Sequence, residues 1–261
     1  MSPTLMPPVD VKLMNLASGL MVLTFAGLTL GAVVDWVVRL PVFAIRSISV
    51  DGDTNHTNAL TLRANVSPRL QGGFLSMDLN ATRQAFEAVP WVRKAVVRRE
   101  FPNRLRVTLQ EHQAQGFWGN ESESRLINSY GEVFEANIGE VDQDDLPRLD
   151  GPVEQSAQVL GMYRSLKPVF EQVNLTLDEL ELSARGGWRA QLDTGAVIEL
   201  GSGADADVLV RTQQFLTTLT HVVSRYGRTV SAVQSADLRH REGYALRLRG
   251  VSTLADDKPK K

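Results

Sequence analysis

The sequence predicts an α+β protein that consists of one membrane-spanning helix, a compact module of strands and helices, and a larger β-rich domain with two helices. Three observations lead to this prediction. A long uncharged segment lies near the amino terminus. Strand and helix patterns follow it in the order β-α-α-β-β, and the rest of the chain contains mainly strand patterns separated by turn residues.

The membrane-spanning helix is predicted at residues 13–38, after a short tail of residues 1–12. Leu13 to Val34 form a run of 22 uncharged residues. As a helix this run extends about 33 Å, enough to cross a hydrocarbon core of ~30 Å. Trp36 follows at the position of an aromatic belt. The alternatives are a buried core helix and a cleaved signal peptide, but a signal peptide has an apolar segment of only ~7–15 residues and a small-residue cleavage site. We therefore predict a retained anchor.

The composition excludes several classes of function. The chain contains no cysteine, which removes disulfides, thiolate metal ligands and thiol catalysis together. Its net charge of -2 gives no electrostatic reason to expect nucleic acid as a partner. Lys12 lies on one side of the predicted span and Arg39 and Arg46 lie on the other, so the positive-inside rule leaves the topology open.

Residues 42–113 are predicted to form the compact module. Its elements are, in order, a strand at 44–50, a helix at 58–66, a helix at 80–89, and strands at 92–99 and 105–109. Asn80 is a favourable N-cap for the second helix. Phe101-Pro102-Asn103 supplies the turn between the last two strands. Apolar and polar residues alternate along the last strand, which indicates one face in the core and one in water.

Residues 114–252 are predicted to form the β-rich domain, and the charged residues 253–261 are predicted to be a disordered tail. Strands are expected at 117–118, 125–128, 133–134, 175–183, 188–192, 196–200, 230–240 and 244–249, with helices at 153–170 and 205–226. Val208, Phe215 and Leu219 lie near helical spacing in the second helix, which predicts a buried stripe.

No catalytic, metal-binding or cofactor-binding constellation is found in the sequence. The four histidines, His56, His112, His221 and His240, are far apart and none has a partner at metal-ligand spacing, so they are interpreted as surface or edge residues. Gly201-Ser202-Gly203 lacks the lysine of a phosphate-binding loop. Asp142, Asp144 and Asp145 lack the glycine and distal glutamate of a calcium loop. The sequence therefore offers no residues to which a catalytic role can be assigned.

Two further patterns leave alternatives open. The hairpin of the compact module is strongly basic, with Arg93, Lys94, Arg98, Arg99, Arg104 and Arg106. It carries no aromatic platform for stacking bases, so the readings are a solvated outer face, or a docking site for an acidic protein or for phospholipid. Gly27 and Gly31 have the spacing that lets two spans pack closely, but this spacing is also common by chance.

The chain resembles the FtsQ/DivIB family of bacterial cell-division proteins over nearly its whole length. The matching stretches, in order, are Val89-Pro90-Trp91-Val92-Arg93, Phe101-Pro102-Asn103, Leu146-Pro147, Leu149-Asp150-Gly151-Pro152, Ser183-Ala184-Arg185 before Trp188, and Asp237-Leu238-Arg239. The resemblance implies that the compact module is a POTRA domain. It also implies a single-pass type II protein of the inner membrane, at the division septum, with its bulk in the periplasm.

The resemblance further implies that the protein is not an enzyme but a scaffold. This scaffold would bind an FtsB/FtsL coiled-coil pair, with FtsB extending the sheet at the last strands of the β-rich domain. Other division proteins would bind the POTRA-like module, and no nucleic acid or cofactor is implied. Carried over by position, the partner-binding residues are Arg185, Arg239, His240, Glu242, Gly243, Tyr244, Leu246, Arg247 and Leu248. His240 departs from the family pattern, which has tyrosine there. The alternatives are a POTRA-bearing secretion or outer-membrane assembly component and an anchored periplasmic hydrolase.

Overall fold

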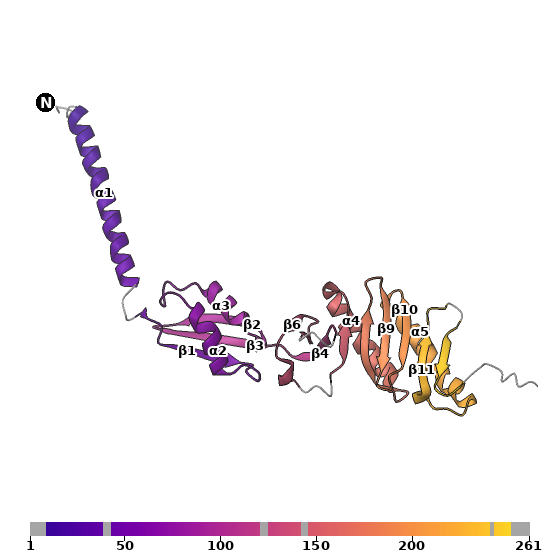
Figure 1. Cartoon of the computed structure of the whole chain (residues 1–261). Helices are drawn as coiled ribbons and strands as arrows, with labels where there is room; N and C mark the ends of the chain where they lie inside the picture. The colour runs from indigo at the N-terminus through magenta and orange to yellow at the C-terminus, as the bar shows by residue number, and fades with distance from the viewer. Residues whose placement is uncertain (1–8, 39–42, 121–124, 142–145, 241–242, 252–261) are drawn as a thin grey trace, which may run out of the picture. The chain divides into compact units, whose positions relative to one another are not determined.

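The structure is a computed structural model that describes residues 9–38, 43–120, 125–141, 146–240 and 243–251 (Figure 1). The chain divides into two compact units, Met1–Glu111 and His112–Lys261. The predicted α+β class is confirmed, because each unit combines strands with helices. The predicted tail at 253–261 and the acidic residues Asp142, Asp144 and Asp145 lie outside the described residues.

Helix α1 (Val9–Val38) begins the described chain. Its segment Leu13–Val37 is long and apolar enough to cross a membrane, and none of it is buried against the rest of the protein. Its polar side chains bond within the helix, since the Thr24 hydroxyl donates to the carbonyl of Met21 at 2.9 Å and the Thr29 hydroxyl to that of Phe25 at 2.7 Å. The outer surface of this helix is therefore compatible with the hydrocarbon core of a membrane.

The first unit has the predicted order β-α-α-β-β. Its elements are β1 (Ser47–Gly52), α2 (Ala59–Val66), the 3-10 turn η2 (Ser67–Arg69), α3 (Leu79–Glu87), β2 (Val92–Glu100) and β3 (Arg104–Glu111). In the described residues these strands form a sheet of order β1-β3-β2, in which β3 is parallel to β1 and antiparallel to β2. Leu62, Phe86 and Val107 lie in the core of this unit.

Two predicted boundaries of the first unit were wrong. The N-cap of α3 is Asp78, not Asn80, because the Asp78 carboxylate accepts hydrogen bonds from the backbone N–H groups of Asn80 and Ala81. Strand β1 begins at Ser47 and not at residue 44, in register with Arg104 where the partner strand begins. Gly52 ends β1 with φ at +104°, and a Cβ there would lie 2.1 Å from the Leu109 carbonyl oxygen, so only glycine fits.

The second unit is built on one mixed sheet. Its strands are β4 (Ala114–Trp118), β5 (Arg125–Asn128), β6 (Val133–Glu135), β7 (Arg148–Asp150), β8 (Leu177–Leu182), β9 (Gly187–Leu192), β10 (Val197–Ser202), β11 (Val233–Asp237) and β12 (Ala245–Leu248). Its helices are η3 (Ile138–Glu140), η4 (Val153–Gln155), α4 (Ser156–Glu171), α5 (Asp205–Arg225) and η5 (Val230–Ala232). Within the described residues the strand order is β12-β11-β10-β9-β8-β7-β4-β5-β6.

The sequence patterns missed one strand and extended another too far. β7 has only three residues, too few for alternation to be read, yet it lies between β4 and β8 and is parallel to both. The strand predicted at 230–240 is η5 followed by β11, and it ends at Asp237. Val230 packs against the same core as Val233, so the apolar pattern does not reveal the change from turn to strand.

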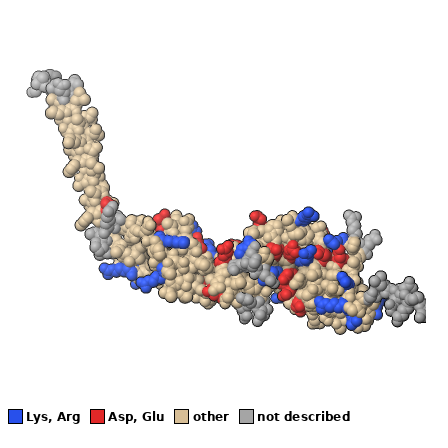
Figure 2. Space-filling model, viewed as in Figure 1, with Lys and Arg blue, Asp and Glu red and all other residues tan. Residues whose placement is uncertain are grey.

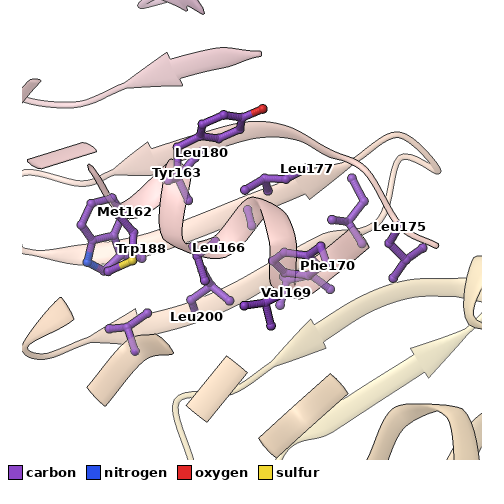
Figure 3. Packing of buried hydrophobic residues seen from close by; sticks show 14 of the residues in the cluster. Met162, Tyr163, Leu166, Val169, Phe170, Leu175, Leu177, Leu180, Trp188 and Leu200 are labelled. Atoms are coloured by element: carbon purple, nitrogen blue, oxygen red, sulfur yellow. The ribbon is translucent and has the colours of Figure 1, made fainter. Parts of the chain in front are cut away.

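The core of the second unit lies between the sheet and its two long helices. α4 packs on β7 and β8, and α5 packs on α4 and β10. Figure 3 shows α4 directing Met162, Leu166 and Phe170 toward the strands that carry Trp188 and Leu200. Burying large side chains of this kind contributes about 1.5–3 kcal/mol each. The two helices therefore cover the sheet from β7 to β10.

Candidate partner-binding edge

The sheet of the second unit ends at β12, a strand with an open side. β12 is antiparallel to β11, with Ala245 opposite Asp237 and Leu248 opposite Val233. In the part of the chain that the structure describes, no strand pairs with the other side of β12. Such an edge leaves backbone donors and acceptors unpaired, which makes it a template for an added strand.

The side chains of β12 lie on the two faces that alternation predicts. Tyr244, Leu246 and Leu248 pack on the core, and Leu248 is only 7% exposed. The Tyr244 ring meets the Phe215 ring edge-on, with the centroids 4.8 Å apart, and its hydroxyl lies 2.9 Å from the Thr218 hydroxyl. The side chains of these three predicted partner-binding residues therefore face inward, and Tyr244 joins the strand to α5.

On its open side, β12 exposes backbone N–H and C=O groups that could pair with an added strand. The Arg249 N–H donates to the Ala232 carbonyl at 2.8 Å, so Arg249 directs its backbone toward β11. Because backbone groups alternate along a strand, Leu248 and Leu246 direct theirs to the open side. Arg247 is exposed on the outer face. The Arg249 side chain instead donates to the carbonyl of Thr194.

Arg239 lies at the end of β11 and is held by one carboxylate. Its Nε and Nη2 donate to the two oxygens of Asp237 at 2.9 and 2.6 Å, and its backbone N–H donates to the same carboxylate at 3.0 Å. These hydrogen bonds from Arg239 lower the pKa of Asp237 to about 2. The Arg239 guanidinium is nevertheless well exposed. It is an oriented cation at the rim of the sheet.

Strand direction brings several predicted residues to one end of the sheet. Ser202 at the end of β10 is opposite Gly187 at the start of β9, so the exposed turn that carries Arg185 lies at this end. β11 runs parallel to β10 and also ends here, followed by Arg239 and the exposed His240. Gly243 is exposed and precedes β12, whereas Arg247 and Leu248 lie farther along that strand. Glu242 lies outside the described residues.

Sequence reasoning missed the charged residues that organise this surface. Arg189 on β9 donates to Glu199 at 2.8 Å and lies 3.4 Å from Glu181, so it joins three neighbouring strands. Asp237 orients Arg239. The sequence pattern that could have indicated this pair is a carboxylate two residues before an arginine at the end of a strand. On the face that Figure 2 shows, basic and acidic side chains are interspersed over this unit. The surface therefore presents paired charges and not one field of a single sign.

The basic hairpin of the first unit is only partly a free surface. Arg99 donates to the carbonyls of Phe74 and Met77 at 2.6 and 2.5 Å, so it fastens the loop before α3. Arg106 lies 3.1 Å from Glu100 and 3.7 Å from Asp51. Two of the arginines that the sequence analysis considered for docking are therefore bonded to groups within the first unit.

Two of the histidines, which were predicted to be surface or edge residues, also make ring contacts; His56 is exposed and His112 is half-buried. The His56 ring stacks on Trp91 with the centroids 4.0 Å apart, and the His112 ring stacks on Phe134 at 4.1 Å. His221 lies 3.1 Å from the Arg225 guanidinium. Among the residues that the structure describes, no group of three potential ligands is placed to hold a metal ion.

In the described residues, one apolar helix long enough to cross a membrane precedes a β-α-α-β-β unit and a nine-stranded sheet, which is the arrangement of a POTRA-bearing protein with a candidate amino-terminal span. Residues 43–112 match the POTRA domain of the FtsQ type, and residues 116–239 match the family described as cell division protein FtsQ/DivIB, C-terminal.

Similar proteins cover nearly the whole chain. It is 40% identical to the cell division protein FtsQ of Burkholderia pseudomallei (strain K96243), over 97% of this chain and 99% of that protein. It is 37% identical to FtsQ of Thiomonas arsenitoxydans, over 94% and 89% of the two chains, and 35% identical to FtsQ of Bordetella pertussis, over 92% of each. The chain belongs to the FtsQ/DivIB family of cell-division proteins, as the resemblance predicted.

Proposed function

We propose that this protein is a non-enzymatic, membrane-anchored scaffold of the bacterial division machinery. It binds an FtsB-type protein, which comes with an FtsL-type protein as a coiled-coil pair, at the open side of β12. It thereby links early and late division proteins at the septum. Its anchor lies in the inner membrane, and both units lie in the periplasm as a type II topology requires. Membership of the family supports this proposal.

The single observation that carries the proposal is the open side of β12 on a rigid support. Leu246 and Leu248 are anchored in the core, so the strand is already ordered before a partner arrives. An ordered edge lowers the entropy that strand addition must overcome. A partner strand that pairs with the backbone of Leu246 and Leu248 extends the sheet without displacing any side chain of the core.

The charged residues at the end of the sheet supply specificity in this proposal. Arg239, which follows β11, and Arg185, in the turn before β9, are exposed cations at the same end of the sheet. Arg247 lies on the outer face of β12. Because Asp237 fixes the Arg239 guanidinium, an acidic partner side chain meets an oriented donor. Complementary charges of this kind set partner choice and the rate of association more than raw affinity.

The test is a titration of the full chain in nanodiscs with a purified FtsB–FtsL pair from the same organism. Leu246→Pro removes an outward-facing N–H, which edge strands tolerate structurally, and we expect binding to weaken at least tenfold. Leu246→Ala is the matched control, because it shortens the same side chain but keeps the N–H. Gly243→Pro is expected to weaken binding by distorting the entry to β12.

Arg239→Glu is expected to weaken binding and to make the remaining affinity less sensitive to salt, because an attractive charge is removed. Arg225→Glu is its control, since Arg225 is an exposed arginine in the last turn of α5. Circular dichroism must confirm that each variant is folded. Unchanged affinity in the folded Leu246→Pro, Gly243→Pro and Arg239→Glu variants would place the partner elsewhere.

A further inference from the structure

Three segments of the chain meet at one end of the first unit. β1 and β3 begin there and β2 ends there, because β3 is parallel to β1 and antiparallel to β2. The Arg46 N–H donates to the Asn103 carbonyl at 3.0 Å, which bonds the residues before β1 to the β2–β3 turn. The Phe74 N–H donates to the Phe43 carbonyl at 2.8 Å, which adds the loop before α3. We call this surface, residues 43–46, 74–78 and 98–106, the hairpin end.

The hairpin end carries apolar side chains that the unit does not bury. Phe101, in the β2–β3 turn, is 80% exposed, and Leu75 is 45% exposed. The Phe101 ring meets the ring of the buried Phe74 edge-on, with the centroids 6.4 Å apart. Arg99 in turn holds the loop of Phe74 through its carbonyl. Apolar side chains from two segments therefore protrude at the same end of the unit, in positions that the fold defines.

The charges at the hairpin end are mainly positive. Glu100 lies 3.1 Å from Arg106 and 3.5 Å from Arg104, so two arginines share one acid. The Asp78 carboxylate caps α3. Arg46 is exposed, and among the described residues no carboxylate pairs with its guanidinium. The arginines of the hairpin end outnumber its acids, Asp78 and Glu100, since they are Arg46, Arg98, Arg99, Arg104 and Arg106.

The hairpin end is also tied closely to the predicted anchor. α1 ends at Val38, and Phe43 follows five residues later. Five residues extend at most about 18 Å. With Leu13–Val37 in a membrane, the hairpin end is therefore held within reach of the headgroup region, which adds roughly 5–7 Å on each side of the hydrocarbon core. Such a tether gives weak contacts a high effective concentration of lipid.

We propose that the hairpin end binds the phospholipid surface of the leaflet at which α1 leaves the membrane. Phe101 and Leu75 insert between the headgroups, and Arg46 and Arg104 pair with lipid phosphates. The tether selects lipid as the partner, because it keeps a phosphate-bearing, partly apolar surface beside these residues at all times. The contact sets the orientation of the first unit on the membrane. This inference rests on the anchor of the proposed function but not on binding at β12.

The absence of cysteine makes the proposal testable with a single label. Phe101→Cys and Leu60→Cys each receive one nitrobenzoxadiazole fluorophore in the full chain, in nanodiscs of phosphatidylcholine and phosphatidylglycerol that contain a headgroup spin-labelled lipid. Leu60 is the matched control, because it is 78% exposed but lies near the start of α2, close to where Thr57 bonds to Glu111 at the far end of β3. We expect at least twofold quenching of the label at position 101 and none at position 60.

Substitutions separate the apolar contribution from the charge contribution, with the label moved to Leu75→Cys so that Phe101 is retained. Phe101→Ser is expected to abolish the quenching, whereas Phe101→Trp is expected to keep it, because indole rings favour the membrane interface. Arg46→Glu is expected to weaken the quenching and to make the remainder less dependent on phosphatidylglycerol and on salt. Lys94→Glu makes the same change of charge at an exposed position near the start of β2, at the other end of the unit, and should have no effect.

Several outcomes would overturn the proposal. Equal quenching at positions 101 and 60 would show that the unit meets lipid without a preferred surface. A blue shift of the label at position 101 that depends on protein concentration, or that appears only when the FtsB–FtsL pair is added, would indicate a protein at the hairpin end instead. An unquenched label at position 101 in a chain that co-purifies with nanodiscs would refute this inference alone. A chain that does not co-purify with nanodiscs would refute the anchor as well.

Discussion

Glu111 determines the conformation of the loop that precedes α2. It is 5% exposed, and its carboxylate accepts hydrogen bonds from the N–H groups of Asn55 at 2.9 Å, His56 at 3.0 Å and Thr57 at 2.7 Å. The same carboxylate lies 3.4 Å from Nδ1 of His56, whose ring stacks on Trp91. One buried acid therefore joins the end of β3 to a loop more than fifty residues earlier in the chain.

The protonation of Glu111 is linked to the stability of the first unit. Burial alone would raise the pKa of its carboxyl, but hydrogen bonds from Thr57, His56 and Asn55 lower the pKa below its ordinary value of 4.5. The folded state thus binds fewer protons here than the unfolded chain. The stabilisation is fully present above the ordinary pKa and is lost as the pH falls through the lower folded value.

We predict that Glu111→Gln destabilises the first unit by about 1.5–3 kcal/mol at neutral pH, because a charged acceptor of three N–H groups is lost. It should also flatten the decline in stability on acidification below the ordinary pKa of 4.5. Hydrogen exchange of the amides of residues 55–62 in the full chain measures both effects. Glu154→Gln, at an exposed carboxylate of the second unit, should change neither. An unaltered pH profile in Glu111→Gln would contradict the linkage.

At the scale of elements, the β5–β6 connection depends on a fully buried asparagine. The Oδ1 of Asn128 accepts hydrogen bonds from the N–H groups of Tyr130 and Glu132, both at 2.9 Å, and its Nδ2 donates to the Glu132 carboxylate at 2.7 Å. Gly131, in the same turn, has φ at +80°, and a Cβ there would lie 2.5 Å from Cα of Ala157 at the start of α4. The turn is therefore fitted closely against the helix.

We predict that Asn128→Ala destabilises the second unit by about 2–4 kcal/mol, because two backbone N–H groups lose their acceptor in a buried site. Urea unfolding of the full chain in detergent, followed by circular dichroism, gives the change in free energy. The matched control is Asn137→Ala, which removes an exposed side chain that caps η3 through a single bond to Gly139, with an expected effect of about 1 kcal/mol or less. Equal effects of the two substitutions would show that burial of Asn128 is unimportant.

At the scale of the whole molecule, the segment Leu13–Val37 is long and apolar enough to cross a membrane. We predict that it is a retained anchor and that the residues after it are extracytoplasmic. A reporter that is active only in the periplasm should be active when fused after Lys261, and the mature protein should keep its amino terminus. Cytoplasmic reporter activity, or a mature chain that begins beyond Asp35, would contradict the anchor.

The sequence predicted those features that depend on neighbouring residues. The run from Leu13 to Val34 indicated the apolar helix because length and lack of charge suffice for that conclusion. The order β-α-α-β-β followed from turn residues and local periodicity. The strand predicted at 244–249 is also present as β12, where alternation places Tyr244, Leu246 and Leu248 on one face and Arg247 on the other.

What only the tertiary structure decided is which distant segments meet. β7 is too short to have a readable period, and its place between β4 and β8 is set by backbone pairing across the sheet. Arg239 bonds to the Asp237 carboxylate, and Arg99 donates to the carbonyl of the distant Phe74. Both bonds depend on how the folded chain positions these groups. The periodicity of apolar residues shows that one face of an element is buried, but it does not show which other element covers that face. The hydrophobic effect is non-directional, so many apolar surfaces can cover it equally well. For the same reason alternation groups Leu246 with Tyr244 and Leu248, but only the packed structure shows that their shared face covers the core.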